Sequence, residues 1–496
     1  MIPLSLAQIA TIVGGTLNEA ADPQAVVDGT VEFDSRKVTP GGLFLCIPGA
    51  RVDGHDYAAT AIAAGAVAVL ASRPVDVPAI MVQPLGKIDT NATALENDED
   101  GSAAAVLQAL GKLARHVVKT LVAEETLTVV GITGSSGKTT TKDLISQVLT
   151  TGGPVVAPPG SFNNELGFPW TALRADRDTR FLVLEMSARG IGHIRELADI
   201  VAPSIGVVLN VGHAHLGEFG SQEAIAQAKG ELVEALPAAA YGGFAVLNAD
   251  DERVSQMAQR TSARVITYGT HPSADFTAEN IHLDELSRAS YTLVTMGQEY
   301  PVELAVSGQH NVLNSLAALI VAHACTIPMK RAIKALRSAT ITSGRRMEVR
   351  ELADGTIVIN DSYNANPDSM RAAFTALSVM AHPAPDTHRS SWAVLGMMGE
   401  LGEESVAQHT ALAETLGACG IDHVVLVGRC PEMDSLCDAA QDIGVSVVSV
   451  DNKEDAVSYL AEHRHPGDVI LVKASQAVGL WTIADAVSAA ANGAAE

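Results

Sequence analysis

The chain has 496 residues, of which 47% are hydrophobic and 18% charged, so it can bury a sizeable core and is not disordered as a whole. Its length allows roughly three domains of about 100–200 residues each. The 57 Asp and Glu residues outnumber the 33 Lys and Arg residues and leave a net charge of −24. This charge excludes a general binder of nucleic acid or anionic membrane, because such proteins need a large basic surface.

The five cysteines are scattered without a close CxxC pair, which argues against a disulfide framework and against a zinc site. The first stretch, MIPLSLAQIATIVGG, has no basic residues, and no uninterrupted apolar run reaches the length of a membrane span. We therefore expect a cytoplasmic protein without integral membrane association. Anions must be bound by a few placed backbone N–H groups, single basic side chains or metal ions.

Three stretches of the chain differ in pattern and predict three α/β domains. Residues 1–123 combine short strand-like segments with helical runs. Residues 124–340 alternate apolar strands with helical segments, which is typical of a parallel sheet covered by helices. Within this stretch, residues 275–306 resemble an antiparallel addition to the sheet. The alternation begins again over residues 341–496, which predicts a further, smaller α/β domain.

A polar and acidic segment, residues 86–102, interrupts the first stretch. Its composition predicts an exposed loop or insertion, and the simplest interpretation is a solvated connector without a role. A helix is expected to follow it over residues 103–122.

The strongest local motif is the glycine-rich loop GITGSSGKTT at residues 131–140. It follows an apolar strand and opens a helix, which is the context of a phosphate-binding loop, although its spacing departs from GxxxxGK[ST]. Glycines let backbone N–H groups point at phosphate, the helix N-terminus adds partial positive charge, and Lys138 is expected to reach the β- and γ-phosphates. The Thr139 hydroxyl is placed to bind Mg²⁺. The expected phosphate contacts are Gly134, Ser135, Ser136, Gly137, Lys138, Thr139 and Thr140.

Further polar residues follow this loop at the ends of later strands. Glu185 ends the strand FLVLE, and His213 and His215 follow the strand SIGVVLNV. Lys229 lies on the next predicted helix. Ligands gather at the carboxyl ends of strands in open α/β sheets, and Mg²⁺ prefers oxygen ligands such as Glu185. Singly, each residue could be a surface charge or a loop residue, but together they indicate a nucleotide site with two cations.

A phosphate loop alone does not choose between a GTPase, a kinase, a motor and a ligase. The chain has no Asn-Lys-x-Asp motif for guanine and no DE pair closing a strand as in helicase motors. Instead, seven segments occur in the order seen in the Mur ligases of peptidoglycan synthesis: GITGSSGKTTTK, LEMS, NVGHAHLGEFGS, AQAKGEL, LNADD, GQHNVLNSLAA and GRRMEV. The chain resembles this family over nearly its whole length.

The resemblance implies a central P-loop ATPase domain with a parallel sheet. It also implies an N-terminal α/β domain that binds a nucleotide sugar and a C-terminal Rossmann-like α/β domain. The segments SFNNELGFP (161–169) and NDSYNANPDSMRAA (360–373) resemble the branch of the family that adds D-alanyl-D-alanine. The implied substrates are UDP-N-acetylmuramoyl-tripeptide, D-alanyl-D-alanine and ATP. The implied reaction is an ADP-forming ligation through an acyl phosphate. We expect a monomer, but the sequence itself leaves the oligomeric state open.

The resemblance also implies the metal ligands. One Mg²⁺ would be bound by Thr139 and Glu185, and a second by His215 and Lys229. In the family, the lysine at the position of Lys229 is carbamylated, which turns a cation into an oxygen ligand. His213 lies outside the family's Ala-His-Leu context and is treated as a neighbour.

The remaining roles implied by the resemblance concern the nucleotide and the two substrates. Asn311 and Asn314 would face the adenine, Asp361 the ribose and Arg345 the phosphates. Asp34, Ser35 and Arg36 would hold the uridine nucleotide, and Tyr363, Asn364 and Asn366 would lie near the dipeptide. The implied catalytic residues are Lys138, Lys229, His215 and Arg345. Because these ligands come from different domains, we expect hinge closure near residues 340–346.

The C-terminal stretch departs from the family pattern at several positions. Met397 stands where the family commonly has an aspartate, so a carboxylate is missing there. Ala474 and Gln476 replace the glycine and arginine of a Lys-Gly-Ser-Arg pattern. These changes leave open how strictly the dipeptide is selected, and the tripeptide's third residue also stays open.

Two alternatives remain at this stage. The first is a relative that adds amino acids to another carboxylate, such as a folylpolyglutamate synthetase. Asp34-Ser35-Arg36 and Asp53-Gly54-His55 argue against it, because folate-type members lack the nucleotide-sugar module. The second is a nucleotide-dependent switch or motor without ligase chemistry, which the segment NDSYNANP disfavours.

Overall fold

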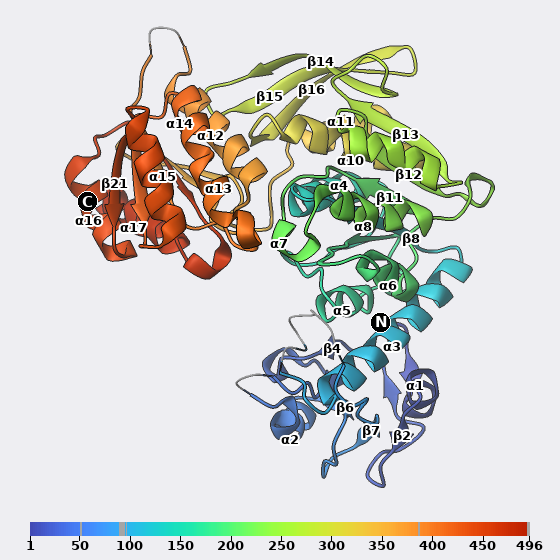
Figure 1. Ribbon diagram of the computed structural model, residues 1–496. Coiled ribbons are helices and arrows are strands. Elements are labelled where there is room, and N and C mark those ends of the chain that lie inside the picture. The colour runs from blue at the N-terminus through green and yellow to red at the C-terminus, as the bar shows by residue number, and fades with distance from the viewer. Residues whose placement is uncertain (50–51, 89–94, 96, 385–386, 494–496) are drawn as a thin grey trace.

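The computed structural model describes residues 1–49, 52–88, 95, 97–384 and 387–493. Three sheets follow one another along the chain and form three lobes (Figure 1). The expected three-part α/β architecture is confirmed. None of the described helices is both long and apolar enough to cross a membrane.

The first lobe is built on a five-stranded sheet with the order β2-β7-β6-β5-β4, in which only β2 runs antiparallel to its neighbour. Its strands are β2 (Thr16–Leu17), β4 (Val31–Glu32), β5 (Gly42–Leu45), β6 (Ala66–Ala71) and β7 (Ala79–Met81). A separate antiparallel pair is formed by β1 (Leu4–Ser5) and β3 (Val26–Val27). The helices are α1 (Leu6–Val13), α2 (Ala58–Ala63) and the long α3 (Ser102–Ala123).

The helix α3 links the first lobe to the second. Its buried face packs against α1 on one side and against α5 (Gly167–Ala172) and α6 (His193–Ile200) on the other (Figure 1). One continuous hydrophobic cluster therefore runs from the first sheet into the central lobe. The expected helix is confirmed, with one more residue at each end.

The acidic segment before α3 has a structural role where the structure describes it, so the interpretation as a connector without a role is wrong. The Asp98 carboxylate accepts hydrogen bonds from the backbone N–H groups of Ala103 and Ala104, at 3.0 and 2.8 Å. These donors belong to the first turn of α3, where a negative charge is favourable. Asp100 in turn accepts from Ser102. Residues 89–94 and 96 of this segment lie outside the described residues.

The central lobe contains a nine-stranded sheet with the order β16-β15-β14-β13-β12-β11-β8-β10-β9. Strands β8 to β14 pair in parallel, and β14, β15 and β16 form an antiparallel meander at one edge, as the alternating stretch predicts. The strands are β8 (Thr128–Thr133), β9 (Val155–Val156), β10 (Phe181–Glu185), β11 (Ile205–Val208), β12 (Phe244–Asn248), β13 (Arg264–Gly269), β14 (Phe276–Leu283), β15 (Arg288–Thr295) and β16 (Gln298–Ser307).

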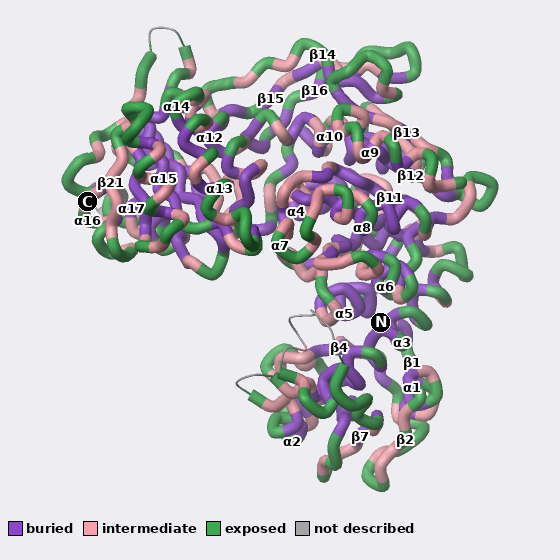
Figure 2. Tube along the Cα trace, viewed as in Figure 1, coloured by how far each residue is buried: buried purple, intermediate pink, exposed green. Residues whose placement is uncertain are grey.

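Helices cover both faces of the parallel part, which explains why its strands are apolar at successive positions. Val129 of β8 packs into the cluster that includes α8 (Gln222–Glu234), whereas Val130 packs with α4 (Lys138–Leu149) and α10 (Asn311–Ala324). Successive side chains of a strand point to opposite faces, so both faces need apolar residues. The tube in Figure 2 is accordingly buried through the central strands. The other helices of this lobe are α7 (Leu216–Phe219), α9 (Glu252–Gln256) and α11 (Met329–Leu336).

The third lobe contains a six-stranded sheet with the order β17-β18-β22-β19-β20-β21, parallel except for β17. Its strands are β17 (Glu348–Glu351), β18 (Ile357–Asn360), β19 (Ser391–Leu395), β20 (His423–Val427), β21 (Ser446–Val450) and β22 (Val469–Lys473). Its helices are α12 (Pro367–Ala381), α13 (Ser405–Thr410), α14 (Leu412–Ala418), α15 (Pro431–Asp442), α16 (Lys453–His463) and α17 (Trp481–Gly493).

The connection to the third lobe is fixed to the helix α4. The buried ion pair of Lys142 and Asp143 (2.7 Å) contacts Ser343, with Lys142 Nζ 3.1 Å from its hydroxyl oxygen and Asp143 accepting from its backbone N–H. Gln147 holds Thr340 through two further hydrogen bonds. Residues 340–343 are therefore attached to the central lobe. If the third lobe moves relative to the central lobe, the hinge must lie after Ser343.

We expect Asp143→Ala to lower the free energy of unfolding by about 3–5 kcal/mol, because the Lys142 ammonium would stay buried without its partner. Denaturant unfolding followed by circular dichroism measures this loss. Lys142→Met combined with Asp143→Leu should recover much of it, since neither charge is then buried. The exposed pair of Glu223 and Arg253 is the control, and Glu223→Ala should have little effect. Equal stability of Asp143→Ala and the native chain would contradict the importance of the buried pair.

Candidate active site

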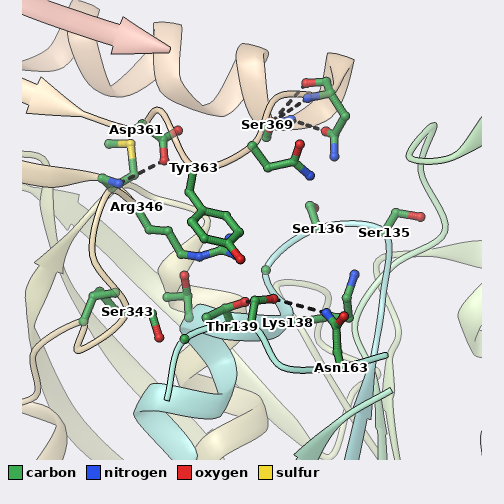
Figure 3. A pocket seen from close by; sticks show the side chains of 18 of the residues that line it. Ser135, Ser136, Lys138, Thr139, Asn163, Ser343, Arg346, Asp361, Tyr363 and Ser369 are labelled. Carbon is green, nitrogen blue, oxygen red and sulfur yellow. Dashed lines mark hydrogen bonds between the residues drawn. The ribbon is translucent and has the colours of Figure 1, made fainter. Parts of the chain in front are cut away.

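A cavity of about 1410 Å³ lies where the central and third lobes meet. Its wall combines the loop before α4, the segment 159–166, the start of α10 and the segment that begins the third lobe. Figure 3 shows Lys138 and Thr139 on one side and Arg346 and Tyr363 on the other. Residues more than 200 positions apart in sequence thus face the same space.

The glycine-rich loop is shaped by the strand next to it. Ser135 N–H donates to the Asn210 carbonyl at 3.1 Å, and Ser136 N–H donates to Asn210 Oδ1 at 2.9 Å. Asn210 follows β11, so the loop is braced at the carboxyl end of the neighbouring parallel strand. Gly137 has φ +82°, a conformation that favours glycine, and a Cβ there would lie 3.0 Å from Asn314 Oδ1. In this conformation, residues 135–140 of the loop line the cavity.

Lys138 is the first residue of α4, and its charge interacts with those of Glu185, Arg346 and Glu400. Its ammonium donates to the Gly134 carbonyl at 2.6 Å, across the loop where a phosphate would bind. Burial lowers the pKa of Lys138 to about 8; the carboxylate of Glu185 opposes this effect and the guanidinium of Arg346 adds to it. Because Arg346 is close enough to shift this pKa, the cavity concentrates two cations in one place.

Behind Lys138, Thr139 and Glu185 form a buried polar cluster. Glu185 Oε2 accepts from the Thr139 hydroxyl at 3.1 Å, from the Ser161 hydroxyl at 3.2 Å and from Asn163 Nδ2 at 3.4 Å. Its other oxygen, Oε1, is buried and has no hydrogen-bond partner among the described residues. A buried carboxylate oxygen without a partner is costly, and a cation would satisfy it. The hydroxyl and carboxylate oxygens fit Mg²⁺, a hard cation.

The other two expected metal ligands lie in different surroundings. Lys229 is buried on α8, and its pKa lies well below the usual value because of burial and the charge of Lys138. No hydrogen bond or ion pair joins the ammonium of Lys229 to another described residue. His215 lines the cavity, and its Nδ1 lies 2.6 Å from Glu400 Oε2 without hydrogen-bond geometry. Glu400, which comes from the third lobe, also accepts from Arg189 at 3.0 Å.

The described residues contain no group of three or more His, Cys, Asp or Glu side chains that could hold a metal ion by themselves. Any Mg²⁺ here must therefore take further oxygen ligands from phosphate, from water or from a modified side chain.

Two adjacent arginines have different positions. The guanidinium of Arg345 lies over the ring of Trp481, 4.1 Å from its centroid, and Arg345 does not line the cavity. Arg346 does line it and stacks on Tyr363, also at 4.1 Å (Figure 3). The Arg346 Nε is buried without a partner among the described residues. The structure therefore brings Arg346, rather than the expected Arg345, to the phosphate loop.

The residues expected around the nucleoside lie in the cavity wall. Asn311 and Asn314 are joined by a hydrogen bond of 2.8 Å at the buried start of α10. Asp361 follows β18, and its carboxylate pairs with the buried Lys473 at 2.5 Å and accepts from Met347 N–H at 3.0 Å. Lys473, at the end of β22, thus fixes Asp361 in place.

The residues expected near the dipeptide also line the cavity, but one of them, Asn366, caps a helix. Asn366 is the N-cap of α12, where its Oδ1 accepts from Ser369 N–H at 2.9 Å. Asn364 accepts from Ala365 N–H through its own Oδ1 and anchors Lys473 through its backbone carbonyl. Tyr363 turns its ring toward the phosphate loop (Figure 3).

Asp34, Ser35 and Arg36 do not line this cavity; among the described residues of the first lobe, Phe33 does. Asp34 caps a short 3₁₀ turn by accepting a hydrogen bond from the backbone N–H of Arg36. Its two hydrogen bonds with the exposed Arg36 guanidinium lower the pKa of Asp34 to about 2. These three residues therefore offer a separate surface on the first lobe.

Sequence reasoning missed several residues of the cavity. Arg346 was available from the motif GRRMEV, which contains two arginines. Asn210 and Lys473 end predicted strands at the edge where ligands gather, so their positions carried a signal. The family pattern has a carboxylate at the position of Met397, which this chain lacks. Glu400, three residues later, brings a carboxylate to the cavity wall instead. No local pattern pointed to Glu400.

The parallel sheet, the phosphate loop at its carboxyl edge and the buried Thr139–Glu185 pair define a P-loop nucleotide-binding protein whose site is completed by another lobe. Comparison with known proteins agrees with this class. Residues 30–118, 132–322 and 345–476 match, in turn, the Mur ligase family catalytic domain, the Mur ligase middle domain and the Mur ligase glutamate ligase domain. The chain belongs to the Mur ligase family.

Three of the similar proteins are ligases of this family. The chain is 50% identical to the UDP-N-acetylmuramoyl-tripeptide–D-alanyl-D-alanine ligase of Mycobacterium tuberculosis over 99% of this chain and 98% of that protein. The crystal structure of MurF from Acinetobacter baumannii is similar with a TM-score of 0.82 and 27% identity, over 98% and 99% of the two chains. The MurF ligase of Thermotoga maritima in complex with ADP has a TM-score of 0.75 and 28% identity, over 93% and 98%.

Proposed function

We propose that this chain is an ATP-dependent ligase that joins D-alanyl-D-alanine to UDP-N-acetylmuramoyl-tripeptide. One observation carries the proposal: a phosphate loop and the Asn364–Asn366 segment face the same cavity from two lobes. A carboxylate activated at the first can therefore be attacked by an amine held at the second. The relatives named above support both substrates.

The chemistry requires activation, because a carboxylate has no leaving group for an amine to displace. ATP transfers its γ-phosphoryl group to the tripeptide carboxylate, and the amine then expels phosphate from the acyl phosphate. The carboxylate and the triphosphate repel each other: two unit charges 4 Å apart cost about 4 kcal/mol at an effective dielectric of 20. Lys138 and Arg346 are two of the side-chain cations that line the cavity, and they would offset the repulsion.

Mg²⁺ fits beside Thr139 and Glu185, where it would neutralise charge on the phosphate oxygens. The unpartnered Oε1 of Glu185 supports this position. A second Mg²⁺ would use His215 and a carbamylated Lys229. Burial beside Lys138 disfavours the ammonium form of Lys229, and an uncharged amine is the form that reacts with carbon dioxide.

We assign the lobes by what they would bind. Residues 1–123 take the uridine nucleotide through Asp34, Ser35 and Arg36, residues 124–340 take ATP, and residues 341–496 take the dipeptide. Asn311 and Asn314 would face the adenine, and Asp361 the ribose. We further propose that the protein is a cytoplasmic monomer.

The folate-type alternative is disfavoured by the match of residues 30–118 to the Mur ligase family and by the 50% identity to a muramyl-tripeptide ligase over nearly the whole chain. The switch or motor alternative does not explain why the Asn364–Asn366 segment faces the phosphate loop across the same cavity, since such a protein needs no second substrate.

The test is to offer UDP-N-acetylmuramoyl-tripeptide, ATP and a set of D,D-dipeptides, and to identify products by mass spectrometry. We expect a UDP-linked pentapeptide and one ADP for each amide formed. Release of ADP without an amide product would favour the switch. An amide formed only with a folate or another carboxylate would favour the first alternative. Comparing lysine-type and diaminopimelate-type tripeptides in the same assay identifies the third residue.

A further inference from the structure

The loop after β11 joins the phosphate loop to the third lobe. Gly212 N–H donates to the hydroxyl of Ser135 at 2.9 Å, and the next residue, His213, donates its backbone N–H to Asp368 Oδ2 at 3.0 Å. Asp368 lies in the first turn of α12, directly after the Asn364–Asn366 segment. Two hydrogen bonds therefore connect the ATP side of the cavity to its dipeptide side.

Asp368 is closely fitted to this loop. Both of its carboxylate oxygens lie 3.3 Å from His213 Nδ1, and Arg371 of the same helix donates to Oδ1 at 3.0 Å. A Cβ on Gly212 would lie 2.1 Å from Asp368 Oδ2, so the observed approach requires glycine at this position. The ring of His213 is held from the other side by Gln222.

A second contact nearby closes the same interface. Gly217 N–H donates to the Glu400 carbonyl at 3.3 Å, and a Cβ on Gly402 would lie 2.7 Å from Gly217 Cα. In Figure 1, α7 accordingly lies beside the part of the third lobe that precedes α13. The segment 212–217 thus contacts the third lobe at two places. Of the third-lobe residues in these contacts, only Asp368 belongs to α12, the helix that directly follows the proposed dipeptide segment.

We propose that Asp368 is a positioning residue that latches α12 onto the loop Gly212–His213. The latch sets the distance between the phosphate loop and the dipeptide segment. The proposal rests on the proposed function for the identity of the second substrate. Asp368 lies in the cavity wall, and the role assigned to it is indirect. On one side it acts through the segment Gly212–His213, which is hydrogen-bonded to Ser135 of the phosphate loop. On the other side it acts through α12, whose N-cap is Asn366.

Asp368→Asn tests the latch, because it keeps the shape but weakens a charge-assisted hydrogen bond. Gly212→Ala is the second variant, because its added Cβ would clash with the Asp368 carboxylate and push α12 away from the loop. Glu432→Gln is the matched control, since Glu432 follows the N-terminal proline of α15 as Asp368 follows that of α12, and its partners are Cys430, Ser405 and His409 within the third lobe. The control separates loss of the latch from loss of a helix-dipole charge.

Two measurements are made on the full chain. Steady-state kinetics should show the KM for D-alanyl-D-alanine raised about tenfold or more in both variants, with the KM for ATP within about twofold of the native value. Small-angle X-ray scattering of the nucleotide-free protein should show a larger radius of gyration for both variants than for the native chain and for Glu432→Gln.

An unchanged radius of gyration in Asp368→Asn overturns the latch, as does an unchanged dipeptide KM in an active enzyme. The scattering measurement needs no activity, so the latch is tested even if the native chain makes no dipeptide product. In that case only the proposed function fails. A fall in kcat and a rise in every KM together, with native scattering, would assign Asp368 to general folding stability and reject the latch.

Discussion

Lys138→Ala will abolish ADP release that depends on the tripeptide, with a loss of at least about 10³-fold in kcat. The ammonium lies across the phosphate loop at 2.6 Å from the Gly134 carbonyl, beside the expected position of the γ-phosphate. Without it, the cavity loses one of the cations that offset the repulsion between the triphosphate and the tripeptide carboxylate. A coupled assay of ADP formation at saturating substrates measures the loss.

The control for this prediction is Lys330→Ala. Lys330 is an exposed lysine in the first turn of α11, just as Lys138 is in the first turn of α4, and it lies in the same lobe. Its removal should leave activity unchanged. ADP formation by Lys138→Ala at a near-native rate would remove the assignment of this loop to ATP.

The second large effect is expected at Lys229. Lys229→Ala should lose activity, and a small added carboxylic acid such as acetate or formate should partly restore it. The reason is chemical: a carbamate is an oxygen ligand for Mg²⁺, alanine is not, and a free carboxylate can enter the space that the shortened side chain leaves. Burial beside Lys138 makes an unmodified ammonium at this position costly.

Carbamylation itself is detectable without activity. Carbon-13 NMR of the native protein in labelled bicarbonate should show a carbamate signal that is absent from Lys229→Ala. Lys330→Ala, in which an exposed lysine is removed, should keep that signal. Full activity in Lys229→Ala, together with no carbamate signal in the native chain, would reject the carbamate and leave Lys229 as a structural lysine.

Local patterns predicted the elements that carry their own signal. The phosphate loop was predictable because glycines, Lys138 and Thr139 stand in unbroken order between an apolar strand and a helix. The parallel sheet was predictable because strands buried on both faces are apolar at successive positions. Glu185 was predictable because it ends such a strand, at the edge where ligands gather.

Contacts between distant segments were not predictable in the same way. Arg345 and Arg346 are neighbours with the same chemistry, and only packing against Trp481 and Tyr363 decides which one enters the cavity. Asp98 looked like part of a solvated acidic run, but the start of α3 lies within reach of its carboxylate. Side-chain direction depends on tertiary neighbours that a local pattern does not contain.

The sequence by itself determined the α/β class, the phosphate loop and the membership in a family of ligases. These follow from residues close together in the chain, whose hydrophobic period and backbone freedom act locally. Only the tertiary structure decided that Glu400 and Asp368 of the third lobe meet His215 and His213 of the second, and that residues 340–343 are fixed to α4. These contacts depend on how whole lobes pack, because the residues that they join lie more than 150 positions apart in the sequence.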